Sequence, residues 1–131
     1  MKRELIKTEI LIATRAFEPA KGSLDLPGGF VDPDETAEEC IIREIEEETG
    51  LIIKHPKYLF SLPNRYVYSD FEVHTLDMFF ESIIKDDVNI IAKDDVAHLQ
   101  FIHPQNIDTS LFGLISIRIG IIKYIKTKED F

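Results

Sequence analysis

Residues 28–51 constrain the fold of this 131-residue chain more than any other segment, and they read GGFVDPDETAEECIIREIEEETGL. Thr36 and Glu39 have the three-residue spacing of a capping box, which marks the first turn of a helix. Apolar side chains follow at helical intervals, and Gly50 stands where a helix ends in a left-handed residue. The segment therefore predicts a helix from Thr36 to Thr49 that is entered from a glycine-rich loop.

The rest of the chain alternates short apolar segments with turn-forming residues. Strands are expected at 10–15, 24–26, 58–62, within 73–84, and at 98–103. We expect a turn at Pro63–Asn64, and a second helix that is capped by Asp108 or Thr109 and runs through Ile125. Strands mixed with two helices predict an α/β layered domain, and no linker divides residues 1–131, so we expect a single domain.

Charge and cysteine content exclude several classes of protein. The net charge of −9 opposes binding to a nucleic-acid backbone, although metal ions can stand between an acidic protein and a phosphate substrate. The single cysteine, Cys40, excludes an internal disulfide framework and a cysteine-built zinc site. No apolar run is long enough to cross a bilayer, and the charged N-terminus lacks the apolar centre of a signal peptide. We expect a cytoplasmic protein that binds neither nucleic acid nor membrane.

The glutamates Glu44, Glu47 and Glu48 have the spacing i, i+3, i+4 and share one face of the predicted helix. Like charges at this spacing repel by about 0.2–0.5 kcal/mol per pair, and a divalent cation would reverse the repulsion. A set of carboxylate oxygens suits magnesium or manganese rather than zinc. The planar fork of Arg43 can hold such carboxylates in place. A solvated acidic face is the alternative interpretation of the charge run, and the spacing of the flanking residues favours the metal site.

The segment resembles the signature of the Nudix hydrolase family. The specified positions of that signature are filled here by Gly29, Glu35, Arg43, Glu44, Ile45, Glu47, Glu48, Gly50 and Leu51. The resemblance implies an α/β/α sandwich with a mixed β-sheet between helices. Members usually have a strand ahead of the one expected here at 10–15, so we also expect a sheet that lacks its first strand.

The resemblance implies a magnesium-dependent hydrolase that cuts the diphosphate bond of a nucleoside diphosphate linked to another moiety, with manganese as a substitute ion. Glu47 and Glu48 would be metal ligands, and the carbonyl of Gly29 would approach the metal. Glu44 would be a third ligand, or the group that orients or deprotonates the attacking water. Arg43 would hold the glutamates through salt bridges.

Further residues are candidates around this centre. Glu35 would support the catalytic residues from the start of the helix. Family members often have one more carboxylate outside the signature, and Asp94 or Asp95 is the candidate because both precede the last expected strand. A solvated acidic loop is the alternative for these two aspartates. Glu72 and Glu81 are weaker candidates.

Candidate substrate-binding residues follow the signature. Residues 61–69, SLPNRYVYS, loosely resemble the Ser-x-Pro-x-x-aromatic segment of NADH-diphosphatase-like Nudix members. Tyr66 or Tyr68 would stack on a base, with ordinary strand packing as the alternative. Arg65 and Arg15 would contact phosphate, with a solvated position as the alternative. These features do not choose among NADH, ADP-ribose, a nucleotide sugar and a nucleoside triphosphate.

Two functions of other classes compete with the enzyme. One is a catalytically silent Nudix-like nucleotide-binding or regulatory module, which has no need of three mutually repelling carboxylates. The other is a calcium-type acidic interaction protein, for which the Asp-x-Asp-x-Asp-Gly loop is missing from the sequence. The expected partner is a small-molecule nucleotide, and the resemblance allows a homodimer.

Overall fold

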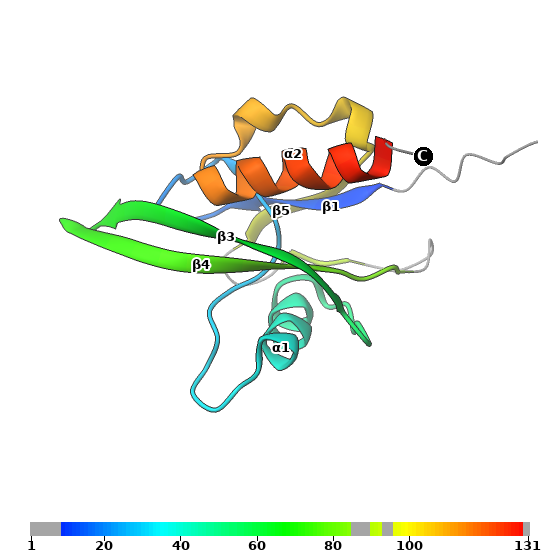
Figure 1. Cartoon of the computed structure of the whole chain (residues 1–131), viewed down its shortest axis with the longest axis horizontal. Helices are drawn as coiled ribbons and strands as arrows, with labels where there is room; N and C mark the ends of the chain where they lie inside the picture. Colours follow the sequence, from blue (N-terminus) through cyan, green and yellow to red (C-terminus); the bar gives the residue numbers. More distant parts are fainter. Residues whose placement is uncertain (1–8, 85–89, 93–95, 130–131) are drawn as a thin grey trace, which may run out of the picture.

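The computed structural model of the chain describes residues 9–84, 90–92 and 96–129. Its elements in chain order are β1 (Ile10–Arg15), β2 (Leu24–Asp25), α1 (Ala37–Thr49), β3 (Lys57–Tyr68), β4 (Phe71–Glu81), β5 (Val96–Ile102), the 3₁₀ helices η1 (Pro104–Asn106) and η2 (Thr109–Leu111), and α2 (Ile115–Glu129). Figure 1 shows α2 on one side of the strands and α1 on the other. The predicted α/β fold with strands between helices is confirmed.

The described strands pair as two antiparallel sheets. β1 lies between β2 and β5, with Ile10 opposite Ile102, and β3 pairs with β4 as a long hairpin. The resemblance to the Nudix family predicts a mixed sheet, which contains both parallel and antiparallel pairs. Among the described residues, parallel pairing is limited to an isolated bridge between Leu24 and Phe112.

The hydrophobic core joins the three-stranded sheet to α2. Ile12 of β1 and Phe112 are fully buried, and Ile121 of α2 is nearly so. Leu24 and Ile102 pack against them. Full burial of a side chain of this size stabilises a fold by about 1.5–3 kcal/mol relative to exposure. This core fixes α2 across β1, and so determines where the first residues of α2 meet the hairpin.

The predicted turn at Pro63–Asn64 is wrong, because β3 continues through both residues. Pro63 pairs opposite Leu76 of β4. A proline has no N–H to donate, and β3 accommodates it because β4 is its one paired neighbour among the described strands. The chain turns instead at Ser69 and Asp70, whose φ angles are 48° and 66°. Asn64 is therefore a strand residue.

The predicted C-terminal helix is interrupted near its start. Asp108 caps only η2, and α2 begins at Ile115. Between them Phe112 is extended (φ −84°, ψ 118°) and fully buried. Gly113 follows at a place where a Cβ would overlap the side chain of Ser23. Packing of Phe112 into the core therefore overrides the local helical pattern.

Two expectations concern the chain as a whole. The missing first strand concerns residues 1–8, which lie outside the described residues. The single domain over residues 1–131 stays a prediction. In the part of the chain that the structure describes, each helix is too short or too polar to span a membrane.

Candidate active site

Helix α1 begins and ends where the sequence predicts. Thr36 is the N-cap: its hydroxyl accepts the N–H of Glu39 at 3.1 Å, and the Glu39 carboxylate accepts the N–H of Thr36 at 2.9 Å. At the other end Gly50 is left-handed, with φ 79°, and its N–H donates to the carbonyl of Glu46 at 2.9 Å. These local bonds set which face of α1 meets the glycine-rich loop.

Arg43 ties the glutamates of α1 to the loop before it. Its Nε and Nη2 donate to the two carboxylate oxygens of Glu35 at 2.7 and 2.9 Å, a two-pronged ion pair. Its Nη1 donates to Glu44 at 2.7 Å and to Glu47 at 3.2 Å. Its Nη2 also donates to the carbonyl of Phe30 at 3.1 Å. These five hydrogen bonds from one guanidinium to four residues hold these groups in a fixed arrangement.

The same contacts set the charge states. Hydrogen bonds from Arg43, helped by the N–H of Asp32, lower the pKa of the Glu35 carboxyl to about 2. Hydrogen bonds to Glu35 and Glu44 raise the pKa of the Arg43 guanidinium above its ordinary value. Burial raises the pKa of the neighbouring Cys40 thiol, so Cys40 stays protonated and unreactive at neutral pH.

Two glutamates of α1 contact the paired glycines of the loop. The N–H of Gly28 donates to Glu48 at 2.7 Å, and Glu48 is buried. A Cβ at Gly29 would overlap the carboxylate of Glu44, so a larger residue here would require the loop or Glu44 to move. Glu47 is different, because its side chain is 46% exposed. The loop and α1 together form one wall that presents carboxylates.

The donor chemistry of this wall fits a hard divalent cation. Glu44, Glu47 and Glu48 supply carboxylate oxygens, and the carbonyl of Gly29 lies against α1. Among the described residues, no three acidic, histidine or cysteine side chains converge as a ready metal site. Glu44 and Glu47 instead accept hydrogen bonds from Arg43. A cation would compete with Arg43 for these oxygens.

A cleft of about 1040 Å³ is lined by β1, the glycine-rich loop, α1, the β3–β4 hairpin and the start of α2. Gly28, Gly29, Glu44 and Glu48 belong to its lining. The volume lies just above the usual range of small-molecule sites, about 300–1,000 Å³. The carboxylate wall therefore faces a space large enough for a nucleotide.

Three of the four predicted substrate-binding residues, Arg15, Tyr66 and Tyr68, line this cleft. Arg15 donates to Asp25 at 2.7 Å and to a backbone carbonyl at 2.6 Å, so its guanidinium is already engaged. Burial raises the pKa of Asp25, although Arg15 opposes that shift. Arg65 does not belong to the lining, and its Nε pairs at 2.9 Å with a glutamate of β4 on an exposed surface. The hairpin places Arg65 on the face that points away from the cleft.

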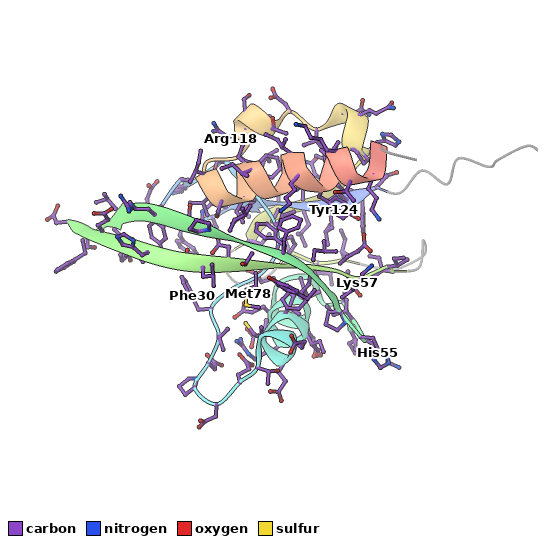
Figure 2. The ribbon with its side chains drawn as sticks, in the orientation of Figure 1. Phe30, His55, Lys57, Met78, Arg118 and Tyr124 are labelled. Atoms are coloured by element: carbon purple, nitrogen blue, oxygen red, sulfur yellow. The ribbon has the colours of Figure 1, made fainter. Side chains whose placement is uncertain are left out.

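The described candidates for an extra carboxylate, Glu72 and Glu81, do not line the cleft. Asp94 and Asp95 lie outside the described residues. Glu72 is the exposed partner of the hairpin arginine and is absent from the lining. Tyr124 of α2 points toward the hairpin in Figure 2, where its hydroxyl donates to Glu81 at 2.5 Å. Glu81 thus joins α2 to β4, at the end of the strand.

Sequence reasoning missed a polar cluster on the hairpin wall of the cleft. Asn64 and Ser116 are buried, and the N–H of Ser116 donates to Asn64 Oδ1 at 3.3 Å. The Ser116 hydroxyl donates to Asp77, which also accepts from the Thr75 hydroxyl at 3.0 Å. Asn64, Thr75 and Asp77 line the cleft. The contacts of Ser116 span 39 and 52 residues, so no local spacing could have revealed them.

The model of the NUDIX domain matches residues 5–118 of the chain. The chain belongs to the Nudix family. This Nudix chain is 37% identical over 107 residues to the ADP-ribose pyrophosphatase of Methanocaldococcus jannaschii, covering 79% of the chain and 60% of that protein. It is 45% identical over 53 residues to the NAD-capped RNA hydrolase NudC of Chromobacterium violaceum, covering 40% of the chain and 20% of that protein.

Comparison with solved structures agrees on the Nudix fold. The MutT NUDIX hydrolase from Burkholderia pseudomallei superposes with a TM-score of 0.72, over 92% of this chain and 89% of that one, at 22% identity. The predicted family and fold are thereby confirmed. The chain spans 60% of the length of the Methanocaldococcus jannaschii relative and 20% of the length of the Chromobacterium violaceum relative.

Proposed function

We propose that this Nudix domain is a magnesium-dependent pyrophosphohydrolase that cleaves the diphosphate bond of a nucleoside diphosphate linked to another moiety. The observation that carries the proposal is the placement of Glu44 and Glu48 in the cleft wall, against the paired glycines of the loop. The Nη1 group of Arg43 donates a hydrogen bond to the Glu44 carboxylate at 2.7 Å and so limits its movement. A carboxylate face beside a loop without side chains suits a diphosphate that carries a metal ion.

Each side chain has a distinct part in this proposal. Glu44, Glu47 and Glu48, with the carbonyl of Gly29, would hold Mg²⁺ or Mn²⁺. When bound, the ion neutralises diphosphate charge and supplies a more nucleophilic water. Arg43 keeps Glu44 and Glu47 in position through its hydrogen bonds. In place of metal binding, Glu44 would orient or deprotonate the attacking water.

The reaction is a displacement at phosphorus. The oxygen of water bonds to one phosphorus, and the bond between that phosphorus and the bridging oxygen breaks. The bridging oxygen leaves with the second phosphate, and the proton of the water passes to Glu44 or to solvent. The products are a nucleoside monophosphate and the phosphorylated remainder.

ADP-ribose is the substrate that we propose first, because the relative aligned over 79% of the chain is an ADP-ribose pyrophosphatase. NADH and nucleoside triphosphates come next. The net charge of −9 supports a small metal-bound nucleotide, and not a nucleic-acid strand, as the partner. A cytoplasmic location and a homodimer belong to the same proposal as expectations from the sequence.

The proposal is tested by incubating the purified chain with Mg²⁺ and ADP-ribose, NADH, a nucleotide sugar, a dinucleoside polyphosphate or a nucleoside triphosphate. We expect AMP and ribose 5-phosphate from ADP-ribose, with turnover that stops in EDTA and returns with excess Mg²⁺. If the chain hydrolyses none of these substrates while it still unfolds cooperatively on heating, the proposal that it is an enzyme is wrong. Calorimetric binding of ADP-ribose by such inactive protein would support the catalytically silent nucleotide-binding module instead.

A further inference from the structure

The carboxamide of Asn64 is almost fully enclosed, yet one of its two ends has no hydrogen-bond partner among the described residues. Asn64 is 6% exposed, and its Oδ1 accepts the backbone N–H of Ser116 at 3.3 Å. A backbone N–H can only donate, so this bond fixes which end of the carboxamide is the oxygen. Within the described residues, the Nδ2 group of Asn64 donates no hydrogen bond.

The Nδ2 group of Asn64 has access to open space, and Asn64 lines the cleft. In the described part of the chain, every fully buried side-chain nitrogen or oxygen has a hydrogen-bond partner. An Nδ2 without a protein partner must therefore touch open space, and the open space that Asn64 lines is the cleft. Enclosed amide groups ordinarily find partners, because leaving one unpaired is costly. A nearly enclosed donor on a residue that lines the cleft points to an acceptor on a ligand.

The surroundings of Asn64 hold it in place and add an aromatic ring. Ser116 is fully buried, and its hydroxyl donates to Asp77 on the neighbouring strand. Tyr66 lies two residues farther along β3, so it shares the face of Asn64, and it also lines the cleft. An aromatic ring stacks on the face of a nucleobase, and a fixed amide donor bonds to a ring nitrogen or carbonyl of the base.

We propose that Asn64 determines nucleobase specificity, by donating from Nδ2 to an acceptor atom of the base while Tyr66 stacks on the ring. The α1 wall then holds the diphosphate, and the hairpin wall holds the base. The inference rests on the proposed function for the ligand class, a nucleotide. It concerns binding, and so it stands or falls independently of turnover.

The test is calorimetric titration of the full chain, with Mg²⁺, against AMP, GMP, CMP, UMP and ribose 5-phosphate, the last as a ligand without a base. Asn64→Asp keeps an oxygen for the N–H of Ser116 and removes both N–H donors. Asn106→Asp is the matched control, because Asn106 is exposed and outside the cleft lining.

The added carboxylate repels both phosphate ligands, so we expect Asn64→Asp to weaken binding of the preferred monophosphate about tenfold more than binding of ribose 5-phosphate, a difference of about 1.4 kcal/mol. Asn106→Asp should change neither affinity. Equal losses for both ligands, no loss for either, or a wild-type chain that binds no monophosphate better than ribose 5-phosphate would each overturn the proposal.

A second measurement on the wild-type chain covers the case in which Asn64→Asp does not fold. The side-chain NH₂ resonances of Asn64 should shift with the preferred monophosphate and stay in place with ribose 5-phosphate. If the chemical shifts of these resonances do not change when the monophosphate is added, the proposal is wrong. Base-dependent binding without hydrolysis would overturn the proposed function alone, and hydrolysis with no role for Asn64 in binding would overturn this inference alone.

Discussion

The two walls of the cleft are built in opposite ways. The hydrogen bonds of Arg43 and of Gly28 that shape the α1 wall join residues close in the chain, and the 20 residues between Gly28 and Glu48 are the widest of these spans. The hairpin wall depends on Ser116 of α2, which reaches Asp77 and Asn64 across 39 and 52 residues. The α1 wall is thus assembled with its own helix and loop, whereas the hairpin wall needs α2 docked on the core. The comparison predicts that damage to the first wall affects chemistry, and that damage to the second affects stability and binding.

Replacement of Glu48 gives the largest expected effect and tests the α1 wall directly. Glu48→Gln keeps an oxygen for the N–H of Gly28 and removes a charge from the cleft wall. We expect kcat to fall at least about a hundredfold, since charge stabilisation at a metal site contributes several kcal/mol. Steady-state kinetics measure this, with Glu46→Gln on the exposed side of α1 as the control. Near-normal turnover of Glu48→Gln at saturating Mg²⁺ would show that the wall is assigned wrongly.

Gly29→Ala tests how closely the loop must approach α1. The added Cβ would overlap the Glu44 carboxylate, which Arg43 holds at 2.7 Å, so either the loop or Glu44 must move. We expect activity to fall about tenfold to hundredfold, the usual result of displacing a catalytic group by about an ångström. Thermal unfolding measured in parallel should show a folded variant. Unchanged kcat would mean that the position of Glu44 is unimportant.

Ser116→Ala tests whether the hairpin wall depends on its contacts with α2 for stability. The substitution leaves the N–H of Ser116 on Asn64 and removes the hydroxyl that donates to Asp77. Loss of this buried donor should lower the free energy of unfolding by about 1–3 kcal/mol. Urea unfolding measures it, with Ser110→Ala at an exposed hydroxyl as the control, expected within about 0.5 kcal/mol of wild type. Equal stability of the two variants would contradict a hairpin wall that depends on α2.

The smallest expected effect is the loss of the stabilising contribution of Glu35 at acidic pH. Its folded-state pKa is lowered from 4.5 to about 2, so its contribution to stability is fully present above pH 4.5 and is lost as the pH falls toward 2. The difference in free energy of unfolding between wild type and Glu35→Gln should therefore be constant near neutral pH and shrink below pH 4.5. Urea titrations from pH 7 downward, roughly one unit apart, measure it. A difference that persists unchanged in acid would refute the ion pair with Arg43.

The contrast between the walls also explains what the sequence could predict. The capping box of Thr36 and the left-handed Gly50 are local, and α1 lies where they predict. The pattern Pro63–Asn64 is equally local and typical of a turn, yet pairing with β4 overrides it and carries Asn64 into the cleft wall. Spacing in the chain predicts interactions within one helix and its loop. It carries no information on which strand residue will meet the start of α2.

The division of labour between the walls is tested most directly by measuring kcat and KM of wild type, Glu48→Gln and Asn64→Asp on the preferred substrate. A residue that binds ground state and transition state alike changes KM alone, whereas one that acts only in the transition state changes kcat. We predict a lower kcat for Glu48→Gln, and for Asn64→Asp a KM raised about tenfold with kcat unchanged. A loss of kcat in Asn64→Asp as large as that in Glu48→Gln, with KM unaltered, would contradict the account.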